Sequence, residues 1–125
     1  MGDQEEKFSQ ERRRAPRVGD SGAKVEYSIT DKDPSFKRAF VKDICIYGIC
    51  IFAPEQIENG TKLSLDIELA GEGTTIMAKG KVMWQKKGDV SGYFNTGIEF
   101  TDMKDESKKA LSEHITANYR GDQEL

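Results

Sequence analysis

Four arginines stand within six positions near the start of the chain: Arg12, Arg13, Arg14 and Arg17. The chain as a whole is acidic, with a formal net charge of -3 and a pI near 5.3, so this positive charge is local. A guanidinium group presents a planar fork of donors that matches phosphate oxygens and the O6/N7 edge of guanine. The segment therefore predicts an anion-binding site that is also able to read guanine.

A second candidate site feature is the stretch from Asp43 to Gly48. A carboxylate such as that of Asp43 can accept the N1–H and N2–H2 pair on the Watson–Crick edge of guanine. A glycine lets a flat base or a phosphate approach the backbone with no β-carbon in the way, while arginines cover the Hoogsteen edge and the phosphates. Together these groups suit a small guanine nucleotide with more than one phosphate.

The elements that must position these groups are predicted from hydrophobic alternation, which is typical of half-buried strands. A helical stripe that includes Leu111 and Ile115 follows, with an N-cap expected at Thr101 or Asp102. Met83 is expected on the polar face of its strand. The predicted fold is mainly β, a six-stranded antiparallel β-barrel with a C-terminal α-helix. The expected strands cover residues 25–29, 36–44, 46–52, 63–69, 76–84 and 94–100.

The 125 residues fit one domain. We expect an acidic, disordered tail at residues 1–11 and a single domain at residues 12–119, followed by a loose tail at 120–125. Within the domain, the divisions are an arginine-bearing ligand loop at 12–22 with a flexible hinge from Gly19 to Gly22, the barrel at 23–101 and the helix at 102–119.

Composition excludes several classes of protein. No apolar run approaches the roughly 20 residues that span a bilayer, and the acidic N-terminus is unlike a signal peptide. Cys45 and Cys50 lie five apart on one expected strand, so they should face opposite ways and not pair. With no metal-type cluster and no nucleophile–base pair, we expect a reduced cytoplasmic protein that is not an enzyme. The lone His114 is expected to be structural.

On these residues, the chain resembles the PilZ domain, a bacterial receptor domain for cyclic di-GMP. The family's Arg-x-x-x-Arg motif falls on Arg13 and Arg17, preceded by Glu11 and Arg12, and its (Asp/Asn)-x-Ser-x-x-Gly motif falls on Asp43 to Gly48. The resemblance covers roughly residues 11–117. Further landmarks agree at Gly48 to Ile51, Gly60, Gly80 to Trp84 and Gly97 to Phe100.

The resemblance implies a split barrel that binds cyclic di-GMP, with no other cofactor and no metal. Arg13 and Arg17 would bind guanine edges and phosphates as the loop wraps the ligand, and Asp43 would read a guanine. Cys45 stands where serine is usual, and a thiol is a weak donor and a poor acceptor. The ligand-binding residues expected on this basis are Arg12, Arg13, Arg17, Asp43, Cys45 and Gly48.

The function expected is a receptor or adaptor that changes the conformation of its arginine loop on binding and signals to an unidentified effector protein, as a monomer or weak homodimer. The main alternative is a ligand-independent interaction module, weakened as a receptor by Cys45. The acidic balance disfavours binding to a nucleic acid polymer, and no membrane insertion is expected.

Simpler roles remain open for several of these residues. The arginines could form a solvated basic segment, Asp43 could cap a turn or pair with Lys42 or Arg38, and Cys45 could be a small strand residue. Trp84 is expected to pack at a barrel end.

Overall fold

The structure is a computed structural model that describes residues 18–19, 23–30, 33–69 and 73–118. Arg12, Arg13 and Arg17 lie outside the described residues, as do most of the expected hinge and both expected tails.

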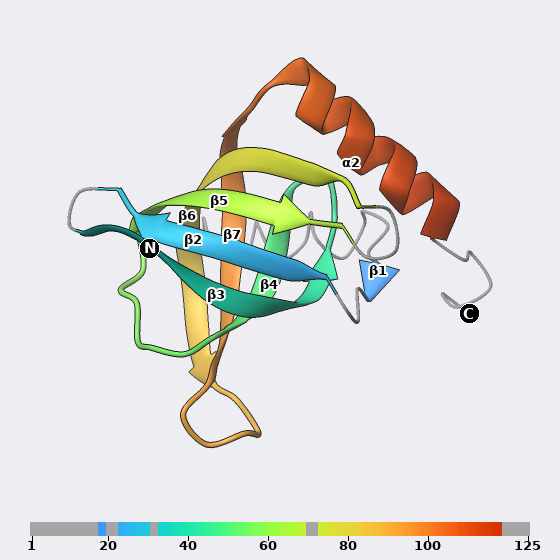
Figure 1. Ribbon diagram of the computed structural model, residues 1–125. Coiled ribbons are helices and arrows are strands. Elements are labelled where there is room, and N and C mark those ends of the chain that lie inside the picture. Colours follow the sequence, from blue (N-terminus) through green and yellow to red (C-terminus); the bar gives the residue numbers. More distant parts are fainter. Residues whose placement is uncertain (1–17, 20–22, 31–32, 70–72, 119–125) are drawn as a thin grey trace.

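Six antiparallel strands close into a barrel, as the alternation predicted (Figure 1). The sheet order is β1-β3-β2-β5-β6-β7-β4, and an additional pairing of β3 with β4 closes the barrel. β1 is a short extra strand that pairs with β3 beyond the end of β2. The elements are β1 (Val18–Gly19), β2 (Lys24–Ile29), β3 (Asp33–Ile44), β4 (Gly48–Ala53), β5 (Lys62–Glu68), β6 (Thr75–Lys87), β7 (Phe94–Met103) and α2 (Asp105–Asn118).

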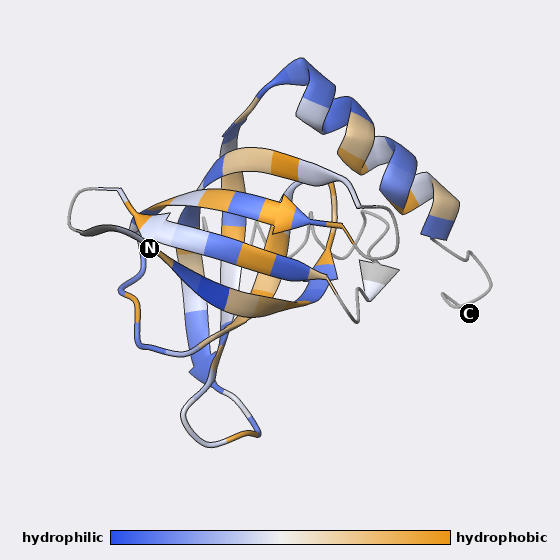
Figure 2. Cartoon of the chain, viewed as in Figure 1, coloured by the Kyte–Doolittle hydropathy of each residue, from blue (hydrophilic) through white to orange (hydrophobic). Residues whose placement is uncertain are grey.

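The barrel interior is filled by every second residue of its strands, because successive side chains of a strand point to opposite faces. β5 shows the pattern most clearly: Leu63, Leu65 and Ile67 are buried, whereas their neighbours are exposed or partly exposed. In Figure 2 the strands accordingly alternate between hydrophobic and hydrophilic colours. The same pleat places polar groups on the outside, where a ligand can reach them.

The C-terminal helix α2 is anchored to the barrel by one apolar stripe. Leu111 and Ile115 belong to the same buried cluster as the barrel interior. At the other end, Asp105 and Glu106 occupy the first turn, where carboxylates favour the positive pole of the helix dipole. His114 is buried on this helix and its carbonyl accepts a hydrogen bond from Asn118.

The predicted start of the helix was wrong by several residues. β7 continues past Thr101, with Asp102 opposite Lys79 and Met103 opposite Ala78. The helix therefore begins at Asp105. Pairing with β6 satisfies the backbone groups of this stretch, and this outweighs the capping preference of a threonine or an aspartate.

The predicted strand over residues 46–52 was also too long. Residues 45–47 form a turn in which the Cys45 amide donates to the Gly48 carbonyl at 2.9 Å, and β4 begins at Gly48. Cys45 and Cys50 thus lie on a turn and on a strand, not on one strand. Both side chains are buried, and neither forms a disulfide with another residue that the structure describes.

Two further expectations fail because of cross-strand pairing. The register of β6 against β7 shifts between Val82 and Trp84, so Met83 is the extra residue of a β-bulge and is buried. Gly19 was expected to belong to a hinge, but it lies in β1 opposite Asp43. Neither register can be read from the alternation of a single strand.

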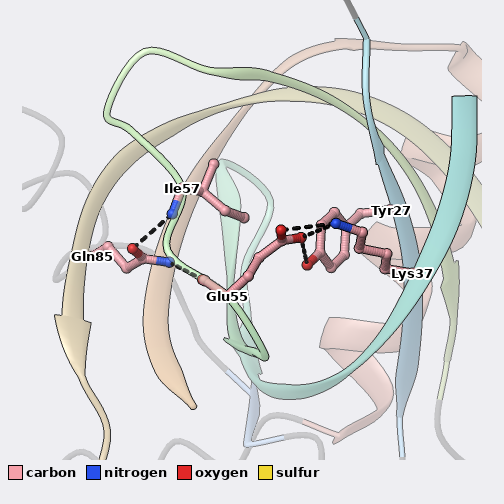
Figure 3. A network of polar contacts seen from close by, with 5 residues as sticks. All are labelled: Tyr27, Lys37, Glu55, Ile57 and Gln85. Atoms are coloured by element: carbon pink, nitrogen blue, oxygen red, sulfur yellow. Dashed lines mark hydrogen bonds and ion pairs between the residues drawn. The ribbon is translucent and has the colours of Figure 1, made fainter. Parts of the chain in front are cut away.

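A polar network fastens the loop between β4 and β5 to the barrel (Figure 3). Tyr27 donates to a carboxylate oxygen of Glu55 at 2.6 Å, and Lys37 contacts both oxygens of that carboxylate at 2.8 and 2.9 Å. Gln85 donates to the Glu55 carbonyl and accepts from the Ile57 amide, each at 3.0 Å. The loop is therefore bound through both its side chains and its main chain.

Candidate ligand-binding site

Asp43 lies at the end of β3, where three strands meet. It is opposite Gly19 of β1 on one side and opposite Cys50 of β4 on the other. The register of β3 against β4 shifts between Val41 and Asp43, which leaves Lys42 as an extra residue. Since Val41 and Ile44 are buried in the core, the bulge and the pleat turn the half-buried Asp43 to the outer face.

The short strand β1 brings the N-terminal part of the chain to this carboxylate. Val18 lies opposite Ile44, and paired residues of antiparallel strands have Cα atoms about 4.5–5.5 Å apart. Arg17 is the residue before Val18, and consecutive Cα atoms are about 3.8 Å apart. The described chain thus begins at Val18, beside the end of the strand that carries Asp43.

Gly48 opens β4 and allows a close approach between strands. A β-carbon at this position would lie 2.2 Å from the carbonyl oxygen of Ile98, which belongs to the backbone of β7. The following ladder pairs Gly48 with Glu99, and the Phe100 amide donates to the Tyr47 carbonyl at 2.9 Å. Gly48 is therefore required by strand packing, whatever it also contributes to a ligand.

Cys45 is placed differently from Asp43. Its side chain is fully buried, with 0% of its surface exposed, and it follows directly after the buried Ile44. The turn residues after it, Ile46 and Tyr47, are 47% and 44% exposed. Contact between Cys45 and a ligand stays a prediction, and its position fits the simpler role of a small packed residue equally well.

A row of residues beside Asp43 was not found from the sequence. The registers align Asp43 of β3 with Cys50 of β4, Gly97 of β7 and Trp84 of β6. A β-carbon on Gly97 would lie 2.2 Å from the indole nitrogen of Trp84, so the indole lies across this glycine. Trp84 was expected at a barrel end, but the row places it on the side of the barrel. To find this row, one needs the register between neighbouring strands, which the sequence of a single strand does not show.

A cleft of about 500 Å³ adjoins the turn at Ile46 and Tyr47, between the end of β7 and α2. This volume falls within the roughly 300–1,000 Å³ of small-molecule sites. Its charged lining groups are Glu99, Asp102 and Lys108. Two carboxylates and one ammonium do not favour the binding of a phosphate group in this cleft.

No group of histidine, cysteine, aspartate or glutamate side chains suited to a metal ion occurs among the residues that the structure describes. In the same ranges, α2 lacks the length and apolar character needed to cross a bilayer. The site described so far consists of Asp43, Gly48 and the chain entering at β1.

Comparison with known protein families identifies the chain. The family model of the PilZ domain matches residues 11–117. The chain belongs to the PilZ domain family. This confirms the resemblance seen in the two motifs, and the PilZ family is one of cyclic di-GMP receptor domains.

Solved structures share the PilZ fold with this chain at low sequence identity. The Bacillus subtilis inhibitor of motility (MotI/DgrA) matches with a TM-score of 0.69 and 19% identity, over 85% of this chain and 50% of that one. The PilZ domain of Escherichia coli YcgR with c-di-GMP matches with a TM-score of 0.67 and 14% identity, over 86% of this chain and 91% of that one.

A third PilZ match is the complex of MrkH from K. pneumonia with c-di-GMP, with a TM-score of 0.65 and 15% identity over 82% of this chain and 50% of that one. The PilZ chain described here thus spans about half the length of the MotI and MrkH chains. No curated protein sequence gives a significant match.

Proposed function

We propose that this chain is a cyclic di-GMP receptor whose arginine segment, residues 12–17, closes over the ligand against Asp43 and Gly48. The observation that carries the proposal is the pairing of β1 with the end of β3. Because of that pairing, the chain leading back to Arg17 starts beside the carboxylate suited to a guanine edge. The c-di-GMP complexes of YcgR and MrkH, which share the fold, support the choice of ligand.

The roles of the residues follow from their chemistry. Arg13 and Arg17 form charge-assisted hydrogen bonds with phosphates and with the Hoogsteen edge of guanine, and Arg12 adds positive charge. Asp43 accepts from the Watson–Crick edge of a guanine. Gly48 keeps β4 close to β7 at the start of the strand. Cys45 supports the turn between them, with at most a weak hydrogen bond.

Ligand binding then acts as a signal because it orders the arginine segment, and this ordering must be offset by the new contacts. The altered surface is read by a partner protein in the cytoplasm, and the chain acts as a monomer or weak homodimer. It performs no catalysis, inserts into no membrane and binds no nucleic acid polymer.

A second candidate function is a PilZ domain that binds a protein partner without any nucleotide. The specific observation in its favour is Cys45, which replaces the usual serine and is fully buried. In that case the arginines are dispensable for partner binding. The two functions make opposite predictions for the same set of variants.

The experiment is an isothermal titration of the full chain with cyclic di-GMP, together with Arg13→Ala, Arg17→Ala and Cys45→Ser variants. We expect saturable binding near micromolar Kd, about -8 kcal/mol. A hydrogen bond to a charged group contributes about 1.5–3 kcal/mol, so each arginine variant should bind roughly tenfold more weakly or worse. Cys45→Ser should bind equally well or more tightly.

Two controls make the titration specific. Arg38→Ala removes an arginine whose side chain is 88% exposed and which pairs with Glu26 away from Asp43, so it should leave the affinity unchanged. Cyclic di-AMP has the same phosphates without guanine edges and should bind poorly. Absence of heat at high cyclic di-GMP concentration, with Cys45→Ser also silent, would reject the receptor and leave the interaction module.

A further inference from the structure

An apolar hollow lies on the outer face of the barrel, one row of residues away from Asp43. It has a volume of about 580 Å³. Phe40, Val90 and Tyr93 are 57%, 64% and 38% exposed, which is unusual for large apolar groups gathered in one place. We call it the aromatic hollow, and its lining residues are Phe40, Lys42, Phe52, Gly88, Asp89, Val90, Tyr93 and Asn95.

The position of the aromatic hollow is fixed by strand register. Phe40 of β3 lies opposite Phe52 of β4, which lies opposite Asn95 of β7. The neighbouring Val41 and Ile51 point into the core, so the two phenylalanines point outward. The remaining wall is the hairpin loop between β6 and β7, which extends beyond the barrel in Figure 1 and carries a hydrophobic segment in Figure 2.

Lysines flank this apolar floor. Phe40, Phe52 and Asn95 form one row across the strands. Lys24 of β2 continues this row opposite Phe40, and Lys86 of β6 continues it opposite Asn95. Lys42, the extra residue of the β3 bulge, lines the hollow, and all three lysines are exposed. One carboxylate, Asp89, lies on the rim. The surface thus suits an acidic segment that carries an aromatic anchor.

The floor also contains a polar group whose hydrogen-bonding capacity is not used. The side-chain oxygen of Asn95 is buried and accepts no hydrogen bond from any residue that the structure describes. A buried acceptor left without a hydrogen bond destabilises the folded chain. Rotation of the terminal amide, whose torsion is soft, would let it pair with the backbone of a chain lying in the hollow.

We propose that the occupant of the aromatic hollow is this chain's own residues 1–11, anchored by Phe8. This segment carries the acidic residues Asp3, Glu5, Glu6 and Glu11 against a single lysine, and Phe8 is its only aromatic residue. Its charge and its one large apolar side chain therefore complement the lysines and the phenylalanine floor.

The length of chain before β1 permits this placement. Phe8 is ten residues before Val18, a span of up to about 33 Å when extended. Val18 lies opposite Ile44, and Phe40 is four residues from Ile44 along β3, about 13 Å away. β1 runs antiparallel to β3, so the chain preceding Val18 must reverse direction, and roughly 20 Å of slack remains for that turn.

This contact would constrain the arginine segment before a ligand binds. With Phe8 bound in the hollow and Val18 paired with β3, the arginine segment between them is held at both ends. A loop closed at its ends loses less conformational freedom when it orders around a ligand. This consequence, unlike the contact itself, rests on the proposed function.

The test uses the full chain without nucleotide and follows trypsin cleavage after Lys7 by mass spectrometry. Phe40→Thr removes the floor of the hollow. Phe36→Thr is the matched control, because Phe36 is on the same strand and 49% exposed but lines a different hollow. When binding of the segment is fast relative to cleavage, the rate follows the fraction released. We expect cleavage about fivefold faster in Phe40→Thr and unchanged in Phe36→Thr.

A second measurement keeps the proposal testable should Phe40→Thr fold poorly. In the unmodified chain, proton NMR should show contacts between the Phe8 ring and the methyl groups of Val90, and Phe8→Ala should abolish them. Equal cleavage rates in all three proteins and no such contacts would overturn the proposal. Loss of self-association in Phe40→Thr with unchanged cleavage would also overturn the proposal, because a second copy of the chain would then be the occupant of the hollow. If the NMR contacts between Phe8 and Val90 are present but the chain does not bind cyclic di-GMP, only the proposed function is rejected.

Discussion

Gly48 shows how one residue of the ligand motif is constrained by packing. The nearest atom to an added β-carbon is the backbone oxygen of Ile98, 2.2 Å away. A backbone atom cannot rotate aside as the end of a side chain can, so β4 and β7 must separate to admit even a methyl group. A residue that is needed for the barrel will be retained whether or not a ligand binds beside it.

We therefore expect Gly48→Ala to lower the free energy of unfolding by about 1–3 kcal/mol, as overpacking typically does. Urea denaturation of the full chain without nucleotide measures this. Gly19→Ala is the control, because a β-carbon there meets no atom within 4 Å, and its change should stay within about 0.5 kcal/mol. Equal stability of the two variants would show that the strands move apart freely.

At the scale of elements, the network at Glu55 binds β2, β3 and the loop after β4 (Figure 3). Burial, then the hydrogen bond to Glu55, then the charge of that carboxylate raise the pKa of Tyr27 well above its usual range. Tyrosine in an unfolded chain ionises near pH 10. The unfolded state alone therefore loses a proton just above pH 10, and the folded state becomes less stable as the pH rises from there.

Tyr27→Phe should remove this dependence. At neutral pH the variant loses one hydrogen bond, worth about 1 kcal/mol. Between about pH 9 and pH 11, its unfolding free energy should fall less steeply than that of the unmodified chain, as followed by urea denaturation at each pH. Tyr47→Phe, at an exposed tyrosine, should keep the steep fall. The idea fails if Tyr27→Phe and the unmodified chain lose stability in parallel.

The elements also show where sequence reasoning succeeded and where it could not. Alternation of Leu63, Leu65 and Ile67 predicted a strand, since burial on one face leaves that mark on the sequence itself. The bulge at Met83 leaves no such mark, because it depends on the partner strand. Residue type and spacing predict Asp43 and Gly48 as ligand-binding residues, and this stays a prediction. The row that joins Asp43 to Trp84 depends on three registers at once, so the sequence could not indicate it.

On the scale of the whole molecule, the barrel and α2 share one core. Leu111 is 1% exposed and belongs to the cluster that fills the barrel. We expect Leu111→Ala to cost about 2–5 kcal/mol and to destabilise strands and helix together. Helical circular dichroism and Trp84 fluorescence should therefore report the same unfolding midpoint. Ser112→Ala, at an exposed neighbour, should change stability by less than about 0.5 kcal/mol.

Two separated transitions in Leu111→Ala would instead identify α2 as an independent unit. The barrel would then remain folded while the helix detached, and the cleft lined by both would open without loss of the outer face at Asp43.

The closure of the sheet by β3 and β4 limits how any protein can recognise this molecule. Many peptide-binding domains extend a sheet by adding the peptide as a further strand, which requires an unpaired edge. Each of the strands β2 to β7 has a neighbour on both sides. A partner that binds over β2 to β7 must therefore read side chains and loops, so its specificity depends on residue identity, and an unrelated extended peptide gains little there from its backbone alone.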